Sequence, residues 1–155
     1  MRQLPTTRER HFDDTAVRQV EVLFDAILPG SDTAPGAKQA RAADFLDHLL
    51  SVDAFYEVAG WRRLYAAGLP GLDATASRRF GRPLADIDTQ EATALLADLA
   101  AGTLADLPAE VNQKALFTAL RGHCIEGCFS DQRWGGNAAG VMWRWLGYPV
   151  ADGGP

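Results

Sequence analysis

Apolar residues recur three and four positions apart along most of this chain, and this repeat is the feature that most constrains its fold. Residues 13–28 show it clearly, because their large apolar side chains fall on one face of a helix that Pro29 and Gly30 then stop. No segment alternates apolar and polar residues for long enough to predict a strand. The sequence therefore predicts an all-α fold. The apolar face of this first helix carries Val17, Val20, Leu23, Phe24, Ile27 and Leu28.

The same repeat, together with local start and stop signals, predicts the remaining helices. Residues 68–71 combine two glycines with a proline, which predicts a break between two helices. Asp88 and Glu91 have the spacing of a capping box, and Pro108 suits the first turn of the longest helix. Asn137 is a candidate cap for a short final helix. The predicted helices cover residues 13–28, 38–50, 53–67, 72–80, 89–101, 108–128 and 138–146.

Length and composition indicate one domain. A chain of 155 residues with 47% apolar content has the usual size for a single hydrophobic core. We therefore expect a single-domain bundle of about five to seven helices over residues 13–150, with a structured aromatic and glycine-rich loop before the final short helix. Residues 1–12 are expected to form a flexible N-terminal segment, and residues 151–155 a flexible tail.

Charge and hydropathy exclude two classes of partner. The net charge is -5, and no cluster of basic residues is interleaved with aromatics, so a nucleic-acid partner is not expected. No apolar run is long enough to span a bilayer, so direct membrane insertion is not expected. The polar N-terminus shows no export signal. These features predict a cytoplasmic protein, or a periplasmic one if the sequence is a trimmed mature form.

Aromatic residues crowd into positions 129–148, and two interpretations of them are open. The rings either close one end of the bundle or bind another protein. Trp143 and Trp145 lie about 200° apart around a helix, so one of them is expected to face away from whatever buries the other. An exposed indole beside Arg133 and Arg144 favours a protein interface, where Trp, Tyr and Arg are enriched. The aromatics of this stretch are Phe129, Trp134, Trp143, Trp145 and Tyr148.

One constellation of polar residues is a candidate for chemistry. His123 and Glu126 are three apart and meet on one helix face, and Asp131 follows shortly after. Together they suggest either a stand-alone helical enzyme or binding module, or a structural set in which a His–Glu hydrogen bond and an Asp131 turn organise the loop. The structural interpretation is favoured. The chain shows no nucleophile elbow, phosphate loop or dinucleotide fingerprint, so no cofactor is expected in this chain itself.

The two cysteines, Cys124 and Cys128, lie four apart on one predicted helix. Their Cβ atoms are then about 5–6 Å apart, whereas a disulfide needs about 4 Å. Two free thiols are therefore expected. Two alternatives stay open: a disulfide to another chain, and a metal site that His123 would complete, although such a site lacks a fourth ligand.

Two blocks of sequence carry a family resemblance. The first block comprises Ala26, Ile27, Leu28, Pro29, Asp32, Thr33, Pro35, Gly36, Ala37, Phe45 and Leu49. The second comprises His123, Glu126, Gly127, Phe129, Ser130, Asp131, Trp134, Gly135, Gly136, Asn137, Gly140, Trp143, Gly147, Tyr148 and Pro149. With these two blocks the chain resembles subunit 3, the small or gamma subunit, of gluconate 2-dehydrogenase and of related flavin-dependent sugar dehydrogenases, over about residues 15–150.

The resemblance implies a non-catalytic accessory subunit. Its partner would be a large FAD-dependent dehydrogenase of the glucose-methanol-choline class that oxidises a sugar, glycoside or other alcohol, passes electrons onward to an electron-transfer protein, and depends on the small subunit for folding and stability. Some relatives are bonded to the large subunit by a disulfide, which makes Cys124 and Cys128 candidates for inter-subunit thiols. The chain departs from the family pattern at Gln132, where proline is usual, and at Trp134, where tyrosine is commoner. A self-assembling structural domain remains a third hypothesis. The residues expected at the partner interface are Phe129, Arg133, Trp134, Asn137, Trp143, Arg144, Trp145 and Tyr148.

Overall fold

The computed structural model describes residues 10–53 and 55–150, and within them it contains helices and no strand. The predicted all-α class is therefore confirmed. None of the described helices is both long and apolar enough to cross a membrane. The α-helices are α1 (Asp14–Ile27), α2 (Ala37–Ala40), α3 (Ala42–Ser51), α4 (Val58–Phe80), α5 (Thr89–Ala101), α6 (Gln113–Phe129) and α7 (Val141–Trp145), and the 3₁₀ turns are η1 (Leu84–Asp86), η2 (Gln132–Trp134) and η3 (Ala138–Gly140).

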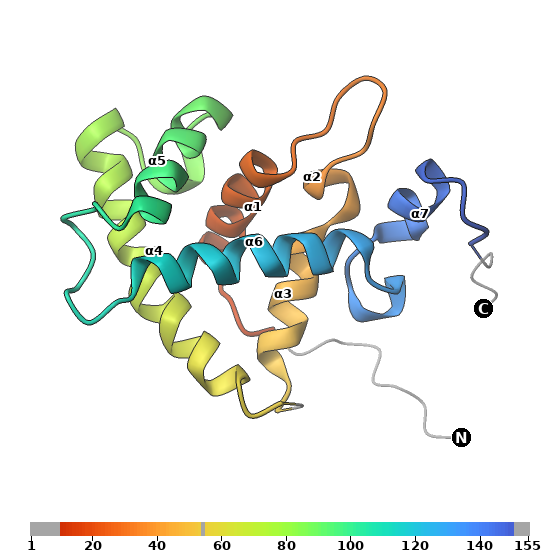
Figure 1. Cartoon of the computed structure of the whole chain (residues 1–155), viewed down its shortest axis with the longest axis horizontal. Helices are drawn as coiled ribbons and strands as arrows, with labels where there is room; N and C mark the ends of the chain where they lie inside the picture. The colour runs from red at the N-terminus through yellow and green to blue at the C-terminus, as the bar shows by residue number, and fades with distance from the viewer. Residues whose placement is uncertain (1–9, 54, 151–155) are drawn as a thin grey trace.

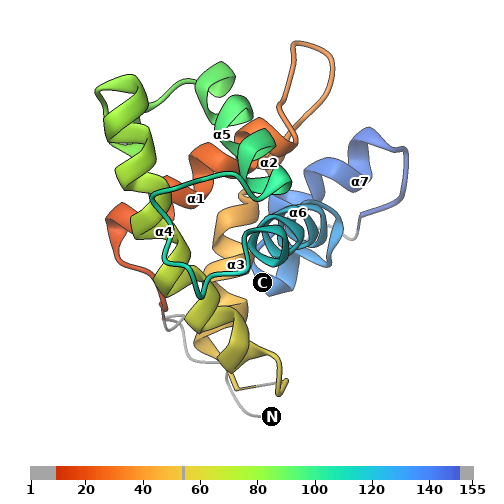
Figure 2. The ribbon, with the colours of Figure 1, turned by 60° about the vertical axis from the view of Figure 1, so that its left-hand side comes forward.

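Helix α6 is the centre of the bundle. It runs across the middle of the molecule in Figure 1, and within the described residues it contacts every other α-helix. Figure 2 looks almost along its axis, with the other long helices gathered on one side. Leu116 and Leu120 of α6 are fully buried and join one continuous core with leucines of α1, α3 and α5. The apolar stripes that the sequence predicts thus meet around a single central helix.

Helix α4 shows a difference from the sequence prediction, because residues 68–71 do not break it. The helix continues through Pro70, although a proline removes a backbone hydrogen bond and strains the turn before it. Leu69 and Leu72 on either side are buried, and this burial stabilises the helical conformation. A side chain at Gly68 would clash with Leu116, and one at Gly71 would come within 2.9 Å of Leu107, so these glycines serve close packing.

Other helix boundaries also differ from the prediction. The predicted helix over residues 38–50 is two helices, because Arg41 adopts φ 53° and turns the chain between α2 and α3. Helix α6 begins after Asn112, whose side chain accepts the Ala115 N–H at 3.0 Å, and not at Pro108. The predicted capping box of α5 is confirmed, since Asp88 and Glu91 accept each other's backbone N–H.

The chain ends also differ from the expectation. Residues 1–9 and 151–155, predicted to be flexible, lie outside the described residues. Residues 10–12 were assigned to the same flexible segment, and here the prediction is wrong. Asp47 accepts the backbone N–H groups of His11 and Phe12 at 2.9 and 2.7 Å, and the Phe12 side chain joins the core. The ordered domain therefore begins before residue 13.

Candidate functional site

After α6 the chain folds back on itself through residues 130–140. Gly136 lies so close to the backbone of Gly127 on α6 that a Cβ atom there would clash with its carbonyl. The next residue, Asn137, donates its backbone N–H to the same Gly127 carbonyl at 2.8 Å. Glycine at position 136 lets the loop backbone meet α6 directly, whereas glycine at position 127 makes room for Ala42 of α3. This contact fixes the loop against the last turn of α6 and thereby positions α7.

Asn137 is the hub of this loop. Its Oδ1 accepts the N–H of Met142 at 2.9 Å, and its Nδ2 donates to the carbonyl of Ser130 at 3.1 Å. The N-cap of α7 is Gly140 and not Asn137, because Ala138–Gly140 forms a 3₁₀ turn and the final helix is shorter than predicted. Asn137 instead reaches the second residue of α7 from outside the helix. Asn137 is fully buried, however. Its assignment to the partner interface is therefore corrected, because the side chain bonds within the chain.

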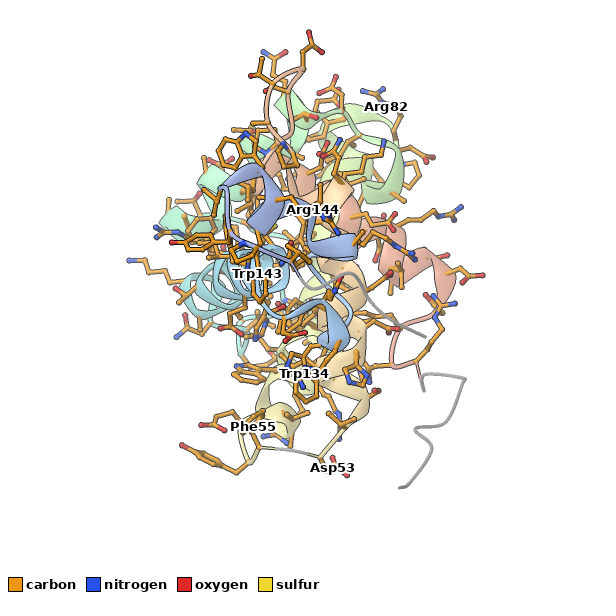
Figure 3. The ribbon with its side chains drawn as sticks, turned by 90° about the vertical axis from the view of Figure 1, so that its right-hand side faces the viewer. Asp53, Phe55, Arg82, Trp134, Trp143 and Arg144 are labelled. Carbon is orange, nitrogen blue, oxygen red and sulfur yellow. The ribbon has the colours of Figure 1, made fainter. Side chains whose placement is uncertain are left out.

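The aromatic rings of this region are displayed at the surface. Trp134 and Trp145 are about half exposed, at 52% and 51%, and Tyr148 is 64% exposed. Trp143 is half-buried, and Figure 3 shows it beside Arg144 above Trp134 on the same face of the molecule. We define the C-terminal aromatic face by Phe129, Trp134, Trp143, Trp145, Leu146 and Tyr148.

Both tryptophans of α7 are held by their indole N–H groups. Trp143 donates to the carbonyl of Phe129 at 2.8 Å, which joins α7 to the end of α6. Trp145 donates to the carbonyl of Thr33 at 3.2 Å, in the loop between α1 and α2. The polar edge of each ring is thus bonded inside the chain while apolar ring area stays accessible. Such rings are ordered before any partner arrives, which lowers the entropy cost of binding.

Charged side chains flank these rings. Asp131 accepts the backbone N–H of Arg133 at 3.0 Å and its guanidinium at 2.9 Å, and these bonds lower the pKa of the Asp131 carboxyl group. The Arg133 guanidinium lies 5.9 Å from the centre of the Trp134 ring. Arg144 donates to the carbonyl of Ala139 at 2.9 Å. Asp131 therefore sets the conformation of η2, and both arginines lie beside exposed tryptophans.

His123 does not meet Glu126 in the structure. It is buried in α6, where its Nδ1 shares a hydrogen bond of 2.8 Å with the Tyr65 hydroxyl group, and its ring packs edge-on against Trp61. Burial lowers the pKa of His123 to about 4, so the ring is neutral at pH 7. Glu126 is exposed on the helix surface. The expected His–Glu hydrogen bond is thus replaced by a His–Tyr bond that the sequence does not signal, because 58 residues separate the partners.

The structure also offers a polar cleft of about 560 Å³ between α3 and the loop after α6. His123, Glu126 and Asp131 do not line it. Its charges largely neutralise one another, since Arg41 pairs with Asp44 at 2.7 Å and Arg10 lies 3.7 Å from Asp47. The three candidate catalytic residues therefore do not converge on this hollow. Its walls carry Arg10, Arg41, Asp44, Asp47, His48, Gln132, Gly135, Gly136 and Ala138.

Both cysteines are free and fully buried. The Cys124 thiol faces the carbonyl of Phe24 at 3.6 Å, and its contact with Cys128, together with burial, raises its pKa. In this conformation neither sulfur atom is accessible from solvent. The assignment of Cys124 and Cys128 as inter-subunit thiols stays a prediction. Among the described residues, no group of three His, Cys, Asp or Glu side chains is placed to hold a metal ion.

The sequence does not signal three exposed features, which are two aromatic rings and one loop. Phe55 and Tyr56 were assigned to a helix, but α4 begins only at Val58, and the two rings are 60% and 90% exposed. Figure 3 shows Phe55 below Trp134 on the same side of the molecule. The loop around Thr33, between two predicted helices, bonds to Trp145. No local signal identifies such a contact, because it depends on where α7 is placed.

Comparison with known proteins agrees with the sequence resemblance. The family model described as gluconate 2-dehydrogenase subunit 3 matches residues 14–149, which include every α-helix described above. No curated protein and no solved structure matches this chain significantly. The family is named for a subunit of a dehydrogenase, which implies a partner subunit. This chain belongs to the gluconate 2-dehydrogenase subunit 3 family.

Proposed function

We propose that this protein is a non-catalytic accessory subunit that binds and stabilises a large FAD-dependent dehydrogenase of the glucose-methanol-choline class. The partner would hold the flavin and oxidise a sugar, glycoside or other alcohol. The C-terminal aromatic face would be the main contact surface. A partner that binds only the folded form of another chain stabilises it by mass action, so an accessory subunit of this kind supports folding without taking part in the chemistry.

The observation that carries this proposal is the C-terminal aromatic face itself. Trp134, Trp145 and Tyr148 expose half or more of their surface within one short segment. Several large apolar side chains exposed to water in one region of a protein surface favour an interaction site. Tryptophan, tyrosine and arginine are the residues that most often dominate binding energy. The rings are also held in place by hydrogen bonds, as a preformed docking surface requires.

The interior of the bundle supports the non-catalytic part of the proposal. His123, the residue best suited to proton transfer, is buried against Tyr65 and Trp61. A general base must lie within hydrogen-bond reach of the proton that it removes. His123 instead uses Nδ1 to bind a tyrosine of its own core. The stand-alone enzyme hypothesis would need His123, Glu126 and Asp131 to line a common hollow.

The first test is affinity purification of the tagged full chain from its native cells, with mass spectrometry and a visible absorbance spectrum of the eluate. We expect a stoichiometric large partner with a flavin spectrum. A colourless monomer would contradict the proposal and favour the stand-alone hypothesis that uses His123. A symmetric oligomer of this chain alone, measured by light scattering, would support the self-assembling domain instead.

The second test is Trp143→Ala in the purified pair. The change removes the ring and its bond to the Phe129 carbonyl, and we expect binding to weaken by about 2 kcal/mol or more, as is usual for a central tryptophan. The circular dichroism spectrum of the subunit should stay helical. Glu110→Ala, on the exposed loop between α5 and α6, is the matched control and should bind normally. Intact complexes with both Trp143→Ala and Trp145→Ala would overturn the assignment of this face.

A further inference from the structure

The loop over residues 29–36 is exposed but internally braced. At its base, Ala37 donates its N–H to the Leu28 carbonyl at 2.8 Å, and Gly36 lies too close to Gly30 to accommodate a side chain. At its tip, Ser31 donates its N–H to the Ala34 carbonyl at 2.8 Å, and its hydroxyl accepts the Ala34 N–H at 3.1 Å. The loop stands away from the helical body between α1 and α2 in Figures 1 and 2. It is therefore a defined protrusion.

This protrusion is physically joined to the C-terminal aromatic face. The indole N–H of Trp145 donates to the Thr33 carbonyl at 3.2 Å, across 112 residues of sequence. Helix α2, which follows the loop, also contacts η3 and α7. Figure 3 shows the loop at the top of the same face that carries α7. The loop and the aromatic face thus form one continuous surface, with Trp145 at the junction.

The size of a stable interface argues that this surface is used as a whole. A standard protein interface buries about 800 Å² on each partner and uses roughly 20–30 residues a side. The C-terminal aromatic face alone provides far fewer side chains than that. The adjoining protrusion extends the surface without a further ordering cost, because its conformation is already fixed by its own hydrogen bonds.

The chemistry of the tip indicates what receives it. Ser31, Asp32 and Thr33 are all exposed, so Asp32 presents a carboxylate to solvent within the loop. A carboxylate in a protein recess is stable when amide N–H groups or a guanidinium group bind it. A partner surface complementary to this tip therefore needs a recess lined with hydrogen-bond donors, next to an apolar wall that covers Trp145.

We propose that the large flavoprotein subunit receives the 29–36 loop in a donor-lined recess, in one interface with the C-terminal aromatic face. This inference rests on the proposed function and names a second contact element for it. Trp145 is a positioning residue in this arrangement: its ring packs on the partner, and its indole N–H fixes the loop at the angle that the recess requires.

Site-specific photo-crosslinking of the complex tests the proposal. A benzophenone amino acid is placed at Asp32 in one sample and at Glu110, an exposed position at the opposite end of α6 from α7, in another. We expect crosslinks to the large subunit from position 32 and none from position 110. Absence of a crosslink from position 32 in an intact complex, or equal yields at both positions, would overturn the proposal.

Affinity measurements separate this inference from the proposed function. Asp32→Ala should raise the Kd by about tenfold through loss of a charged hydrogen bond. Trp145→Phe keeps a ring but loses the bond to Thr33, and should raise the Kd by about threefold to tenfold. Glu110→Ala, outside the proposed interface, is the control and should leave the Kd unchanged. If Trp143→Ala weakens binding while Asp32→Ala and Trp145→Phe do not, the loop is not a contact and the proposed function stands. If the wild-type chain does not bind a flavoprotein, both fail.

Discussion

In the helical body, formed by α1 and α3–α6, leucine side chains from several helices bury one another completely, whereas residues 129–150 hold their shape through a few specific polar contacts. Each buried leucine contributes about 2 kcal/mol through removal of apolar surface from water, and many of them act together. The C-terminal segment instead leaves much of its aromatic surface in water.

The two regions also differ in backbone regularity. The body consists mainly of helices of ten residues or more, and Arg41 before α3 is its non-glycine residue with positive φ. The C-terminal segment is shorter but contains two 3₁₀ turns and two such residues, Asn137 and Ala139. Such conformations cost roughly 1–3 kcal/mol each, so they persist only where surrounding contacts impose them. The comparison teaches that the body supplies the stability and the C-terminal segment presents a surface.

Among the changes that test this comparison, Leu120→Ala should have the largest effect on the free energy of unfolding. The side chain is fully buried in α6, so its truncation removes apolar burial and leaves a cavity. We expect the free energy of unfolding to fall by about 2–5 kcal/mol in urea denaturation. Leu146→Ala, at a 48% exposed position of the C-terminal aromatic face, is the control and should change it by less than about 0.5 kcal/mol. Equal losses in the two variants would remove the distinction between the regions.

Asn137→Ala should have a smaller and local effect. It removes the bonds to Met142 and Ser130 and leaves a buried amide and a buried carbonyl without their partner, at a cost of about 1–3 kcal/mol. Hydrogen exchange of the Met142 amide should accelerate, while amides in the middle of α6 keep their protection. If Asn137→Ala lowered the urea midpoint of global unfolding as much as Leu120→Ala does, residues 129–150 would not be an independent unit.

Lowering the pH should destabilise the body through His123. Its pKa is about 4 in the folded protein and 6.5 in the unfolded chain, so the unfolded chain takes up the proton first as the pH falls. The contribution of neutral His123 is complete above pH 6.5 and is lost progressively down to pH 4, by about 2 kcal/mol between pH 7 and pH 5. Partial desolvation by the surrounding protein raises the pKa of the exposed Glu126 carboxyl group, and this shift stabilises the folded state as the pH falls.

His123→Gln isolates this effect, because it keeps a polar side chain opposite Tyr65 without a titrating ring. The pH dependence of the urea midpoint between pH 7 and pH 5 should be clearly shallower in the variant than in the wild type. Identical pH profiles would mean that His123 is more accessible to protons than its burial implies. Trp143→Ala and the 29–36 loop variants then extend the comparison to partner binding.

Local sequence signals predicted much of the body. The stripe of α1 and the capping box of α5 are properties of residues a few positions apart, and both appear in the structure. The break at Pro70 was wrong because the burial of Leu69 and Leu72 outweighs a local penalty. At the candidate site, helical spacing predicted that one of Trp143 and Trp145 is the more exposed, but not that it is Trp145. The burial of Asn137 was not predictable, since its partners depend on the fold of the whole loop.

The sequence by itself determined the all-α class, most helices and the family, because these depend on periodicity and on motifs that are local in the chain. Only the tertiary structure decided that His123 binds Tyr65, that Cys124 and Cys128 are sealed in the core, and that Trp145 joins α7 to the 29–36 loop. Each of these contacts forms between residues or helices distant in sequence, and its geometry is set by how α6 packs against its neighbours. The physical reason is that burial and hydrogen-bond partners are properties of packed surfaces, which exist only after the helices have met.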